Sequence, residues 1–313
     1  MCVTRSEPQS HMQKSVNARN GLYVRIVNFR TAAEVEQLLN SLPRRRGMHI
    51  EILDNGSEPS QMDDLRRITH DIDRVSLIRS EVNLGFGGGH NLINRCSDAD
   101  PSDYIWLLNP DTVCEGSTLD RLIEEADRDG EAIYSPVIYK PTVDGRVLWF
   151  SGGSIDRLRG VVNDRQDIGT SAVIPTCFVT GAAPFMTRST FDRLGGFNES
   201  LFLYWEDVDM SIRAEALGIP LRVVTRAELL HQEGAASKGT PGIRASAYFY
   251  MSRNRILVCR EEGDRGLSLI FGRGSNAFLR LLAYSILKEG RGRLARTLAI
   301  ARGGLSAVKT RGA

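Results

Sequence analysis

Aromatic and acidic side chains meet in residues 201–218, LFLYWEDVDMSIRAEALG, where Tyr204 and Trp205 directly precede Glu206 and Asp207. Apolar rings beside a carboxylate raise its pKa and offer a wall for a ring-shaped substrate. A carboxylate placed in this way can act as a general base. Because carboxylates are also favoured at the start of a helix, a purely structural role at a helix N-terminus is the alternative explanation.

A second pair of oxygen-bearing side chains, Asn109 and Asp111, flanks Pro110 at the end of the apolar run in LLNPDTV. Hard oxygen ligands of this kind suit Mg²⁺ or Mn²⁺. One carboxylate is too few for a metal site built from protein ligands alone, so we expect any metal here to be shared with a diphosphate. An ordinary Pro-Asp turn that ends the strand is the alternative.

The glycine-rich stretch NLGFGGGHN, residues 83–91, follows an expected strand and opens an expected helix. A dinucleotide fingerprint GxGxxG that began at Gly85 and Gly87 would need glycine where His90 stands, so an NAD-dependent dehydrogenase ranks last among the functions considered. Such a loop still lets the backbone approach an anion. A tight turn that requires glycine is the alternative.

His231 and two arginines complete the candidate residues. His231 ends the apolar run in LLHQEGAASKG, which continues through small residues to Lys238, and a lone histidine is often structural. Arg253 and Arg255 flank Asn254 on an expected helix. Their guanidinium groups could bind a diphosphate or pair with the acids of residues 201–218.

These residues need elements to position them, and the first half of the chain alternates strands with amphipathic helices. We predict strands at 22–29, 49–55, 75–79 and 103–109, with helices between them. This alternation predicts an α/β fold with a parallel, doubly wound sheet covered on both faces. Ligands of such sheets bind at the carboxyl ends of the strands. Polar residues fall at these ends: Asn28, Asp54, Asn55, Asn83, Asn109 and Asp111.

The pattern changes at about residue 132, where β-like runs interrupted by Gly and Pro replace the alternation. The change predicts mixed or antiparallel strands that extend the same sheet as an acceptor-side region. The run SAVIPTCFVTGAAPFMT is one of these β-like runs with Gly and Pro breaks. Helices are expected at 189–194, 206–217 and 243–261.

Bulk composition is that of an ordinary globular protein, with 313 residues, 42% hydrophobic, and a formal net charge of +2. This charge does not indicate a nucleic-acid partner. Five scattered cysteines without a CxxC pair indicate a reducing compartment. No apolar run is long enough to span a membrane, and residues 1–20 resemble a disordered leader. We therefore expect a soluble, cytoplasmic protein.

Several motifs in order resemble family 2 glycosyltransferases, and the bacterial rhamnosyltransferase-like branch in particular. They are LDNGS, NLGFGGGHN, LLNPDT, GGFNESLFLYWEDVDMSIRAEALG and the later histidine. The resemblance covers roughly residues 22–260. It implies a GT-A fold, a Rossmann-like mixed sheet flanked by helices. It divides the chain into a catalytic domain, 21–262, with a nucleotide-sugar half, 21–131, and an acceptor half, 132–262.

The resemblance also implies roles for individual residues. Asp207 would be the base, supported by Glu206, and Asp111 and His231 would bind a divalent metal, Mg²⁺ or Mn²⁺. Asn109 stands in place of the first acid of the family's DxD motif, which leaves one charge fewer at the metal. Contacts to the donor are implied at Asn28, Asp54, Asn83, Gly85, Gly87, Asn91, Asn109 and Asp111, and contacts to the acceptor at Gly181 and Trp205.

The implied reaction is inverting transfer of a sugar, expected to be rhamnose, from a dTDP- or UDP-linked donor to a hydroxyl of a glycan or lipid-linked acceptor in cell-surface polysaccharide synthesis. The motifs do not distinguish rhamnose from galactofuranose or N-acetylglucosamine. A nucleotidyltransferase is an alternative, although the first strand of this chain is not followed by the basic glycine-rich loop that it predicts. A sugar-nucleotide-binding scaffold without chemistry is the other alternative, and the intact WEDVD argues against it.

The final segment, residues 263–313, is rich in Arg and Lys, and after Gly272 its only acid is Glu289. Apolar residues fall at helical intervals between the basic ones, which predicts a basic amphipathic helical tail. Such a helix can lie on an anionic membrane surface, and a lipid-linked acceptor would favour contact through 272–313 at the inner face of the plasma membrane. A helix packed on its own domain with a solvated basic face is the alternative.

Overall fold

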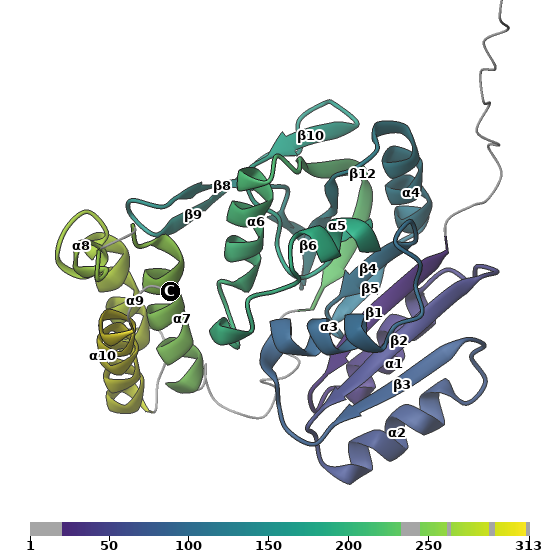
Figure 1. The fold of residues 1–313 in the computed structure, drawn as a ribbon, viewed down its shortest axis with the longest axis horizontal. Coiled ribbons are helices and arrows are strands. Elements are labelled where there is room, and N and C mark those ends of the chain that lie inside the picture. The colour runs from purple at the N-terminus through teal and green to yellow at the C-terminus, as the bar shows by residue number, and fades with distance from the viewer. Residues whose placement is uncertain (1–20, 233–244, 262–263, 288–291, 311–313) are drawn as a thin grey trace, which may run out of the picture.

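A computed structural model describes residues 21–232, 245–261, 264–287 and 292–310. Its centre is a mixed sheet with the strand order β10-β12-β6-β11-β4-β1-β2-β3. Helices flank this sheet, and α7, α9 and α10 lie together at the end of the molecule remote from β3 (Figure 1). The α/β class with a mixed sheet is therefore confirmed, while the expected leader, residues 1–20, lies outside the described residues.

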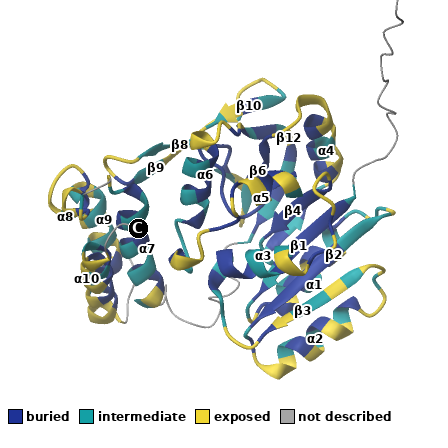
Figure 2. Cartoon of the chain, viewed as in Figure 1, coloured by how far each residue is buried: buried dark blue, intermediate teal, exposed yellow. Residues whose placement is uncertain are grey.

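The first half of the chain forms the parallel part of the sheet, in which β4, β1, β2 and β3 are neighbours. Its central strands are buried on both faces (Figure 2), which explains their nearly continuous apolar sequences. The elements are β1 Leu22–Asn28, α1 Ala32–Ser41, β2 Met48–Asn55, α2 Pro59–Thr69, β3 Val75–Ser80, α3 Gly85–Cys96, β4 Tyr104–Leu108, β5 Thr112–Cys114 and α4 Thr118–Asp129.

The second half adds antiparallel and parallel strands to the same sheet. β11 joins β4 and β6 in antiparallel fashion, β12 runs parallel to β6, and β8 with β9 forms a separate hairpin. The elements are β6 Ile133–Thr142, β7 Gly145–Phe150, β8 Gly153–Asp156, β9 Val161–Asp164, β10 Val173–Thr176, β11 Phe185–Thr187, α5 Arg188–Arg193, the 3₁₀ turn η1 Glu199–Leu201, α6 Glu206–Ala216 and β12 Leu221–His231.

One β-like run is shorter than its composition predicts. Between β10 and β11, residues 177–184 form no strand. The carbonyls of Ala182 and Pro184 still accept hydrogen bonds from the N–H groups of Asn109 and Leu107. Pro184 has no N–H to return a bond, so a regular ladder cannot form there. This irregular segment lies beside the end of β4 and contributes to the site described below.

The C-terminal helices are α7 Ala245–Cys259, α8 Leu267–Phe271, α9 Ser275–Leu287 and α10 Arg293–Lys309. α10 packs closely on α7, because a Cβ at Gly303 would lie only 2.4 Å from the carbonyl oxygen of Phe249. Ile256, Leu269 and Ala307 form a small core between these helices. The appendage is therefore packed on the rest of the chain through α7. The expected boundary at residue 262 lies outside the described residues.

Candidate active site

The parallel register of β1 and β2 places the polar residues at their carboxyl ends side by side. Asn28 and Asp54 are register partners at the ends of β1 and β2, and Asn28 Nδ2 donates to Asp54 Oδ1 at 3.2 Å. Asn28 Oδ1 accepts from the N–H and the hydroxyl of Thr31, which fixes the start of α1. Asp54 is fully buried, and its Oδ2 has no hydrogen-bond partner among the described residues. A desolvated carboxylate oxygen without a donor is costly, so this atom is suited to a ligand N–H.

Amide side chains also shape the glycine-rich loop. Asn55 Nδ2 donates to the carbonyl of Gly85 at 2.9 Å, and Asn55 Oδ1 accepts from the N–H of Leu84 at 2.9 Å. Asn83 Oδ1 accepts from the N–H of Gly85 at 2.8 Å. Gly85 has φ +76°, and a Cβ there would lie 2.1 Å from the carbonyl oxygen of Phe202. Glycine is thus required at this position by both backbone conformation and close approach.

The NPD turn meets His231. The end of β12 pairs with β5, and this pairing carries His231 beside the turn after β4. His231 Nε2 lies 3.1 Å from Asp111 Oδ1 and 3.5 Å from Asn109 Nδ2. The ring of Trp149 packs edge-on against the imidazole, and His231 Nδ1 has no hydrogen-bond partner in the described part of the chain. An aspartate and an imidazole thus converge in a largely buried position.

The segment 177–184 connects this turn to the acidic start of α6. The N–H of Gly181 donates to Asp207 Oδ2 at 3.1 Å. The next residue, Ala182, accepts at 2.9 Å from the N–H of Asn109. Two adjacent residues of one segment therefore hold the Asp207 carboxylate and the NPD turn, which places both at the same end of β4.

The two acids at the start of α6 differ in their surroundings. Asp207 is partly exposed, and its Oδ1 accepts from the N–H of Val208 at 2.8 Å. Burial raises the pKa of Asp207, while the N–H groups of Gly181 and Val208 oppose the rise. Glu206 is buried, and Oε2 of its carboxyl has no partner among the described residues. Burial, followed by the charge of Asp207, raises the pKa of Glu206 well above its ordinary range. Glu206 is thus the acid that favours its protonated form more strongly.

The chain enters α6 through a strained turn. Three aromatic residues, Phe202, Tyr204 and Trp205, have φ angles of 64°, 65° and 72°. This left-handed region costs a non-glycine residue about 1–2 kcal/mol, and strain of this kind concentrates at functional sites. The Phe202 carbonyl accepts from the N–H of Phe86 at 2.8 Å. The turn therefore lies directly against the glycine-rich loop.

Comparison with known proteins decides the family. Residues 23–187 match the family model for glycosyl transferase family 2, which is more than half of the chain. The chain belongs to glycosyl transferase family 2. The mixed sheet flanked by helices matches the GT-A fold of structurally similar glycosyltransferases.

Individual relatives agree with this assignment. The N-acetylglucosaminyl-diphospho-decaprenol L-rhamnosyltransferase of Mycobacterium tuberculosis is 26% identical over 247 residues, covering 71% of this chain and 78% of the relative. Rhamnosyltransferase WbbL of Escherichia coli K12 is 23% identical over 263 residues, covering 76% of this chain and 96% of the relative. The crystal structure of GalNAc-T7 with UDP, GalNAc and Mn²⁺ matches with a TM-score of 0.61 at 14% identity. That match covers 94% of this chain and 55% of GalNAc-T7, and it concerns the fold alone.

Within this glycosyltransferase, the residues expected from sequence fall into distinct environments. Asn109, Asp111 and His231 meet at the NPD turn, and Gly181 contacts Asp207. Both ends of the Asn91 amide bond the neighbouring loop. Its Nδ2 donates to the carbonyl of Phe197, and its Oδ1 accepts from the N–H of Phe197. A Cβ at Gly87 would lie 2.7 Å from Phe197 Cβ. The donor contacts expected at Asn91 and Gly87 stay predictions, and both residues also fix α3 against the 197–202 segment.

Two further residues of the glycosyltransferase were absent from the expected site. Asn55 shapes the glycine-rich loop, although the sequence marked it only as a polar strand end. Asp164 on β9 faces Asp207 closely enough that its charge raises the pKa of Asp207. No motif marks Asp164, because the β8–β9 hairpin that carries it is recognisable only in the fold. Trp205 packs between the central sheet core and the C-terminal helices, so its ring is anchored on both sides.

Proposed function

We propose that this family 2 glycosyltransferase transfers a sugar with inversion from a nucleoside-diphosphate donor to a hydroxyl acceptor, with Asp207 as the base. The observation that supports this most strongly is the connection through Gly181 and Ala182, which sets the Asp207 carboxylate beside the NPD turn. Residues 21–131 would hold the nucleotide sugar, and residues 132–262 would hold the acceptor.

In the proposed step, an Asp207 oxygen accepts the proton of the acceptor hydroxyl while the hydroxyl oxygen forms a bond to the anomeric carbon. The bond between that carbon and the diphosphate oxygen breaks, and the nucleoside diphosphate leaves with the electron pair. Each Asp207 oxygen already accepts one backbone N–H, from Gly181 or Val208. A carboxylate oxygen has a second acceptor site, so Asp207 can hold its position and still receive the proton. A raised pKa makes it a stronger base.

The donor is proposed to carry a pyrimidine nucleotide, in a dTDP- or UDP-sugar. The buried Oδ2 of Asp54 is a free acceptor among the described residues, and both uracil and thymine carry one ring N–H that could reach it. Two relatives are named as rhamnosyltransferases, so rhamnose is the proposed sugar. The Mycobacterium relative is named for a diphospho-decaprenol acceptor, which supports a lipid-linked glycan acceptor in polysaccharide synthesis.

A divalent metal fits the residues at the NPD turn. Asp111 offers a carboxylate, and His231 offers an imidazole whose Nδ1 has no partner in the described chain. Among the described residues, no group of three or more acidic, histidine or cysteine side chains is placed to hold a metal ion, so the remaining ligands would be diphosphate oxygens and water. When bound, Mg²⁺ or Mn²⁺ would stabilise the charge of the leaving diphosphate. Structural neighbours with Mn²⁺ support this assignment.

A thermal-shift panel tests the proposed function directly. We expect dTDP-rhamnose or a UDP-sugar with Mn²⁺ to raise the melting temperature, because a ligand at 100 times its Kd stabilises the native state by about 2.7 kcal/mol. GDP-mannose at equal concentration is the control. A shift with purine donors alone would contradict the pyrimidine assignment of the donor. Binding without transfer to any acceptor or to water would favour a scaffold, and release of pyrophosphate would favour a nucleotidyltransferase.

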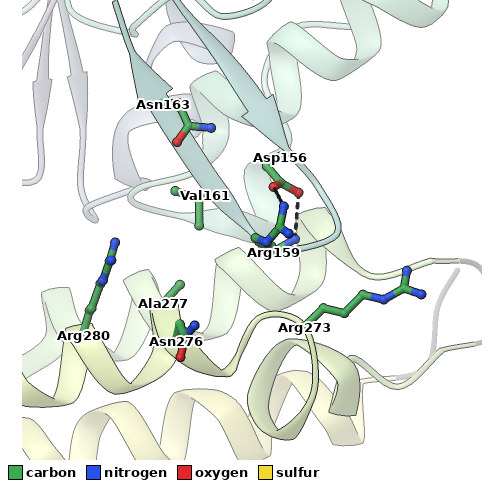
Figure 3. A pocket seen from close by; sticks show the side chains of 8 residues that line it. All are labelled: Asp156, Arg159, Val161, Asn163, Arg273, Asn276, Ala277 and Arg280. Carbon is green, nitrogen blue, oxygen red and sulfur yellow. Dashed lines mark hydrogen bonds and ion pairs between the residues drawn. The ribbon is translucent and has the colours of Figure 1, made fainter.

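We also propose that the C-terminal helices rest on an anionic membrane surface. No helix in the described ranges is long and apolar enough to cross a bilayer. Large apolar side chains are nevertheless exposed on α8, α9 and α10: Phe271, Leu279, Leu287, Leu294, Leu298 and Leu305. Arg273 and Arg280 line a cavity of about 280 Å³ between α9 and the β8–β9 hairpin, where Arg159 pairs with Asp156 (Figure 3). Apolar and basic side chains together suit the headgroup region.

Vesicle sedimentation tests this contact. We expect binding to vesicles that contain phosphatidylglycerol and weaker binding to pure phosphatidylcholine, with a loss at high salt. The double variant Arg273→Glu/Arg280→Glu should reduce sedimentation at least several-fold. The double variant Arg44→Glu/Arg46→Glu, at two exposed arginines outside the C-terminal helices, is the matched control. Equal sedimentation of the double variant and the wild type would remove this surface as the membrane contact.

A further inference from the structure

On the side that faces α7, the strained turn before α6 accepts hydrogen bonds from one asparagine, Asn254. Asn254 is fully buried. Its Nδ2 lies 2.7 Å from the carbonyl oxygen of Leu201, 2.8 Å from that of Leu203 and 2.9 Å from that of Tyr204. An amide nitrogen carries two hydrogens, so three carbonyls share two donors. The Asn254 Oδ1 atom accepts from Arg253 Nη1 at 3.0 Å, which fixes the orientation of the amide.

The convergence of these carbonyls follows from the backbone of the turn. Phe202, Tyr204 and Trp205 take left-handed φ angles, which turn the chain away from a regular helix or strand. Carbonyl dipoles that point to one place repel one another, and buried carbonyls without a donor lower the stability of the fold. The Asn254 amide supplies donors at that place. It therefore offsets both the repulsion and part of the left-handed strain.

The other side of the turn is bonded to the donor half. The N–H of Phe86 in the glycine-rich loop donates to the carbonyl of Phe202. The turn between α7 and this loop leads directly into Glu206 and Asp207, the first residues of α6. A shift of the turn must therefore move the start of α6 and change the 3.1 Å bond between Gly181 N and Asp207 Oδ2.

We propose that Asn254 is a positioning residue for the transfer reaction, which holds the 201–204 turn so that Asp207 faces the acceptor hydroxyl. The proposal rests on the proposed role of Asp207 as base. Asn254 itself is buried behind the turn and acts through the backbone. Through Asn254, α7 belongs to the catalytic unit, although this helix lies outside the residues matched by the family model.

Two near-isosteric variants test the role of Asn254. Asn254→Asp replaces the donor with an oxygen that repels the three carbonyls, and Asn254→Leu removes the donor without adding charge. We expect hydrolysis of dTDP-rhamnose in Mn²⁺ to lose roughly 30–100-fold in kcat, because a misplacement of about 1 Å can cost about 10²-fold. The KM for the donor should stay within about threefold, since no donor contact is assigned to Asn254. Asn40→Asp, at an exposed asparagine of α1, controls for the added charge.

The pH profile separates positioning from a loss of stability. The charged groups that face Asp207 are Glu206 on its own helix and Asp164 on β9, and Asn254→Leu changes neither. The Gly181 N–H lowers the pKa of Asp207, so losing that bond should move the acid limb of kcat to higher pH. A variant that is only less stable would show the acid limb of kcat at the same pH as the wild type.

Hydrogen exchange keeps the test independent of turnover. We expect the amides of residues 202–209 to exchange faster in both Asn254 variants, while those of β1 and β2 keep their protection. An unchanged kcat, acid limb and exchange rate in 202–209 would overturn the proposal. A wild type that turns over no nucleotide sugar would refute the proposed function instead, and the exchange data would still decide whether Asn254 holds the turn.

Discussion

Asp207→Asn should reduce sugar transfer by roughly 10²–10⁴-fold, the range that a positioned general base contributes. The amide keeps the shape of the carboxylate, so the variant should still fold and bind the donor with a similar KM. It has no charge with which to accept the proton of an acceptor hydroxyl. The measurement is kcat and KM for dTDP-rhamnose, with water or a glycan as the acceptor. Turnover equal to that of the wild type would remove Asp207 as the base.

Asp209→Asn is the matched control for this variant. Asp209 lies in the same first turn of α6 but pairs with Arg213 at 2.8 Å, in an i,i+4 ion pair. The change removes the same charge from the same helix, so activity should stay within about threefold, since such pairs contribute only about 0.3–0.5 kcal/mol. A comparable loss in both variants would point to the charge of the helix start, and not to a base.

The pH profile of wild-type activity should also show that Asp207 acts as a base. A base works only when deprotonated, so activity should rise with pH through the folded pKa of Asp207. Burial raises that pKa, which places the limb above the ordinary aspartate value of about 3.9. The negative charge of Asp164 raises this pKa further and so moves the limb upward. In Asp207→Asn this limb should disappear from the residual activity.

Much of the fold could be predicted from sequence because its signals are local. The β-branched runs that end at Asn28 and Asp54 are buried strands, and the amphipathic segments between them are helices. Family motifs, each a continuous stretch of sequence, marked Asp207, Asp111 and His231. The structure then showed that strand register and β5–β12 pairing bring Asp111 and His231 together, a result that residue spacing alone could not give.

Other parts of the site could not be predicted, because they depend on contacts between distant segments. Asn254 bonds Leu201, which is 53 residues away in sequence. Left-handed φ angles at Phe202 and Tyr204 oppose the intrinsic preference of aromatic residues, so no propensity argument reaches them. α3 begins at Gly85, where Asn55 and Asn83 bond the loop that enters it. At these positions, hydrogen bonds between distant segments determine the backbone conformation more than the local sequence pattern does.

Asp111→Asn should be the second most damaging change at the site. The variant keeps an oxygen ligand but removes the only carboxylate of the NPD turn, which leaves the turn without an anionic ligand. Metal stabilisation of a leaving diphosphate is worth several kcal/mol, so we expect a loss of about 10²-fold or more in kcat/KM. Calorimetry of Mn²⁺ binding in the presence of dTDP should show weaker binding. Asp144→Asn, in the exposed turn between β6 and β7, is the control.

The reciprocal change, Asn109→Asp, tests the same electrostatic argument in the opposite direction. It restores the first acid of the DxD motif beside Asp111 and His231. Since a second carboxylate adds charge next to a divalent cation, less Mn²⁺ should be needed for half-maximal activity and for half-saturation in calorimetry. Metal requirements unchanged in both Asn109→Asp and Asp111→Asn would mean that the NPD turn does not hold the cation.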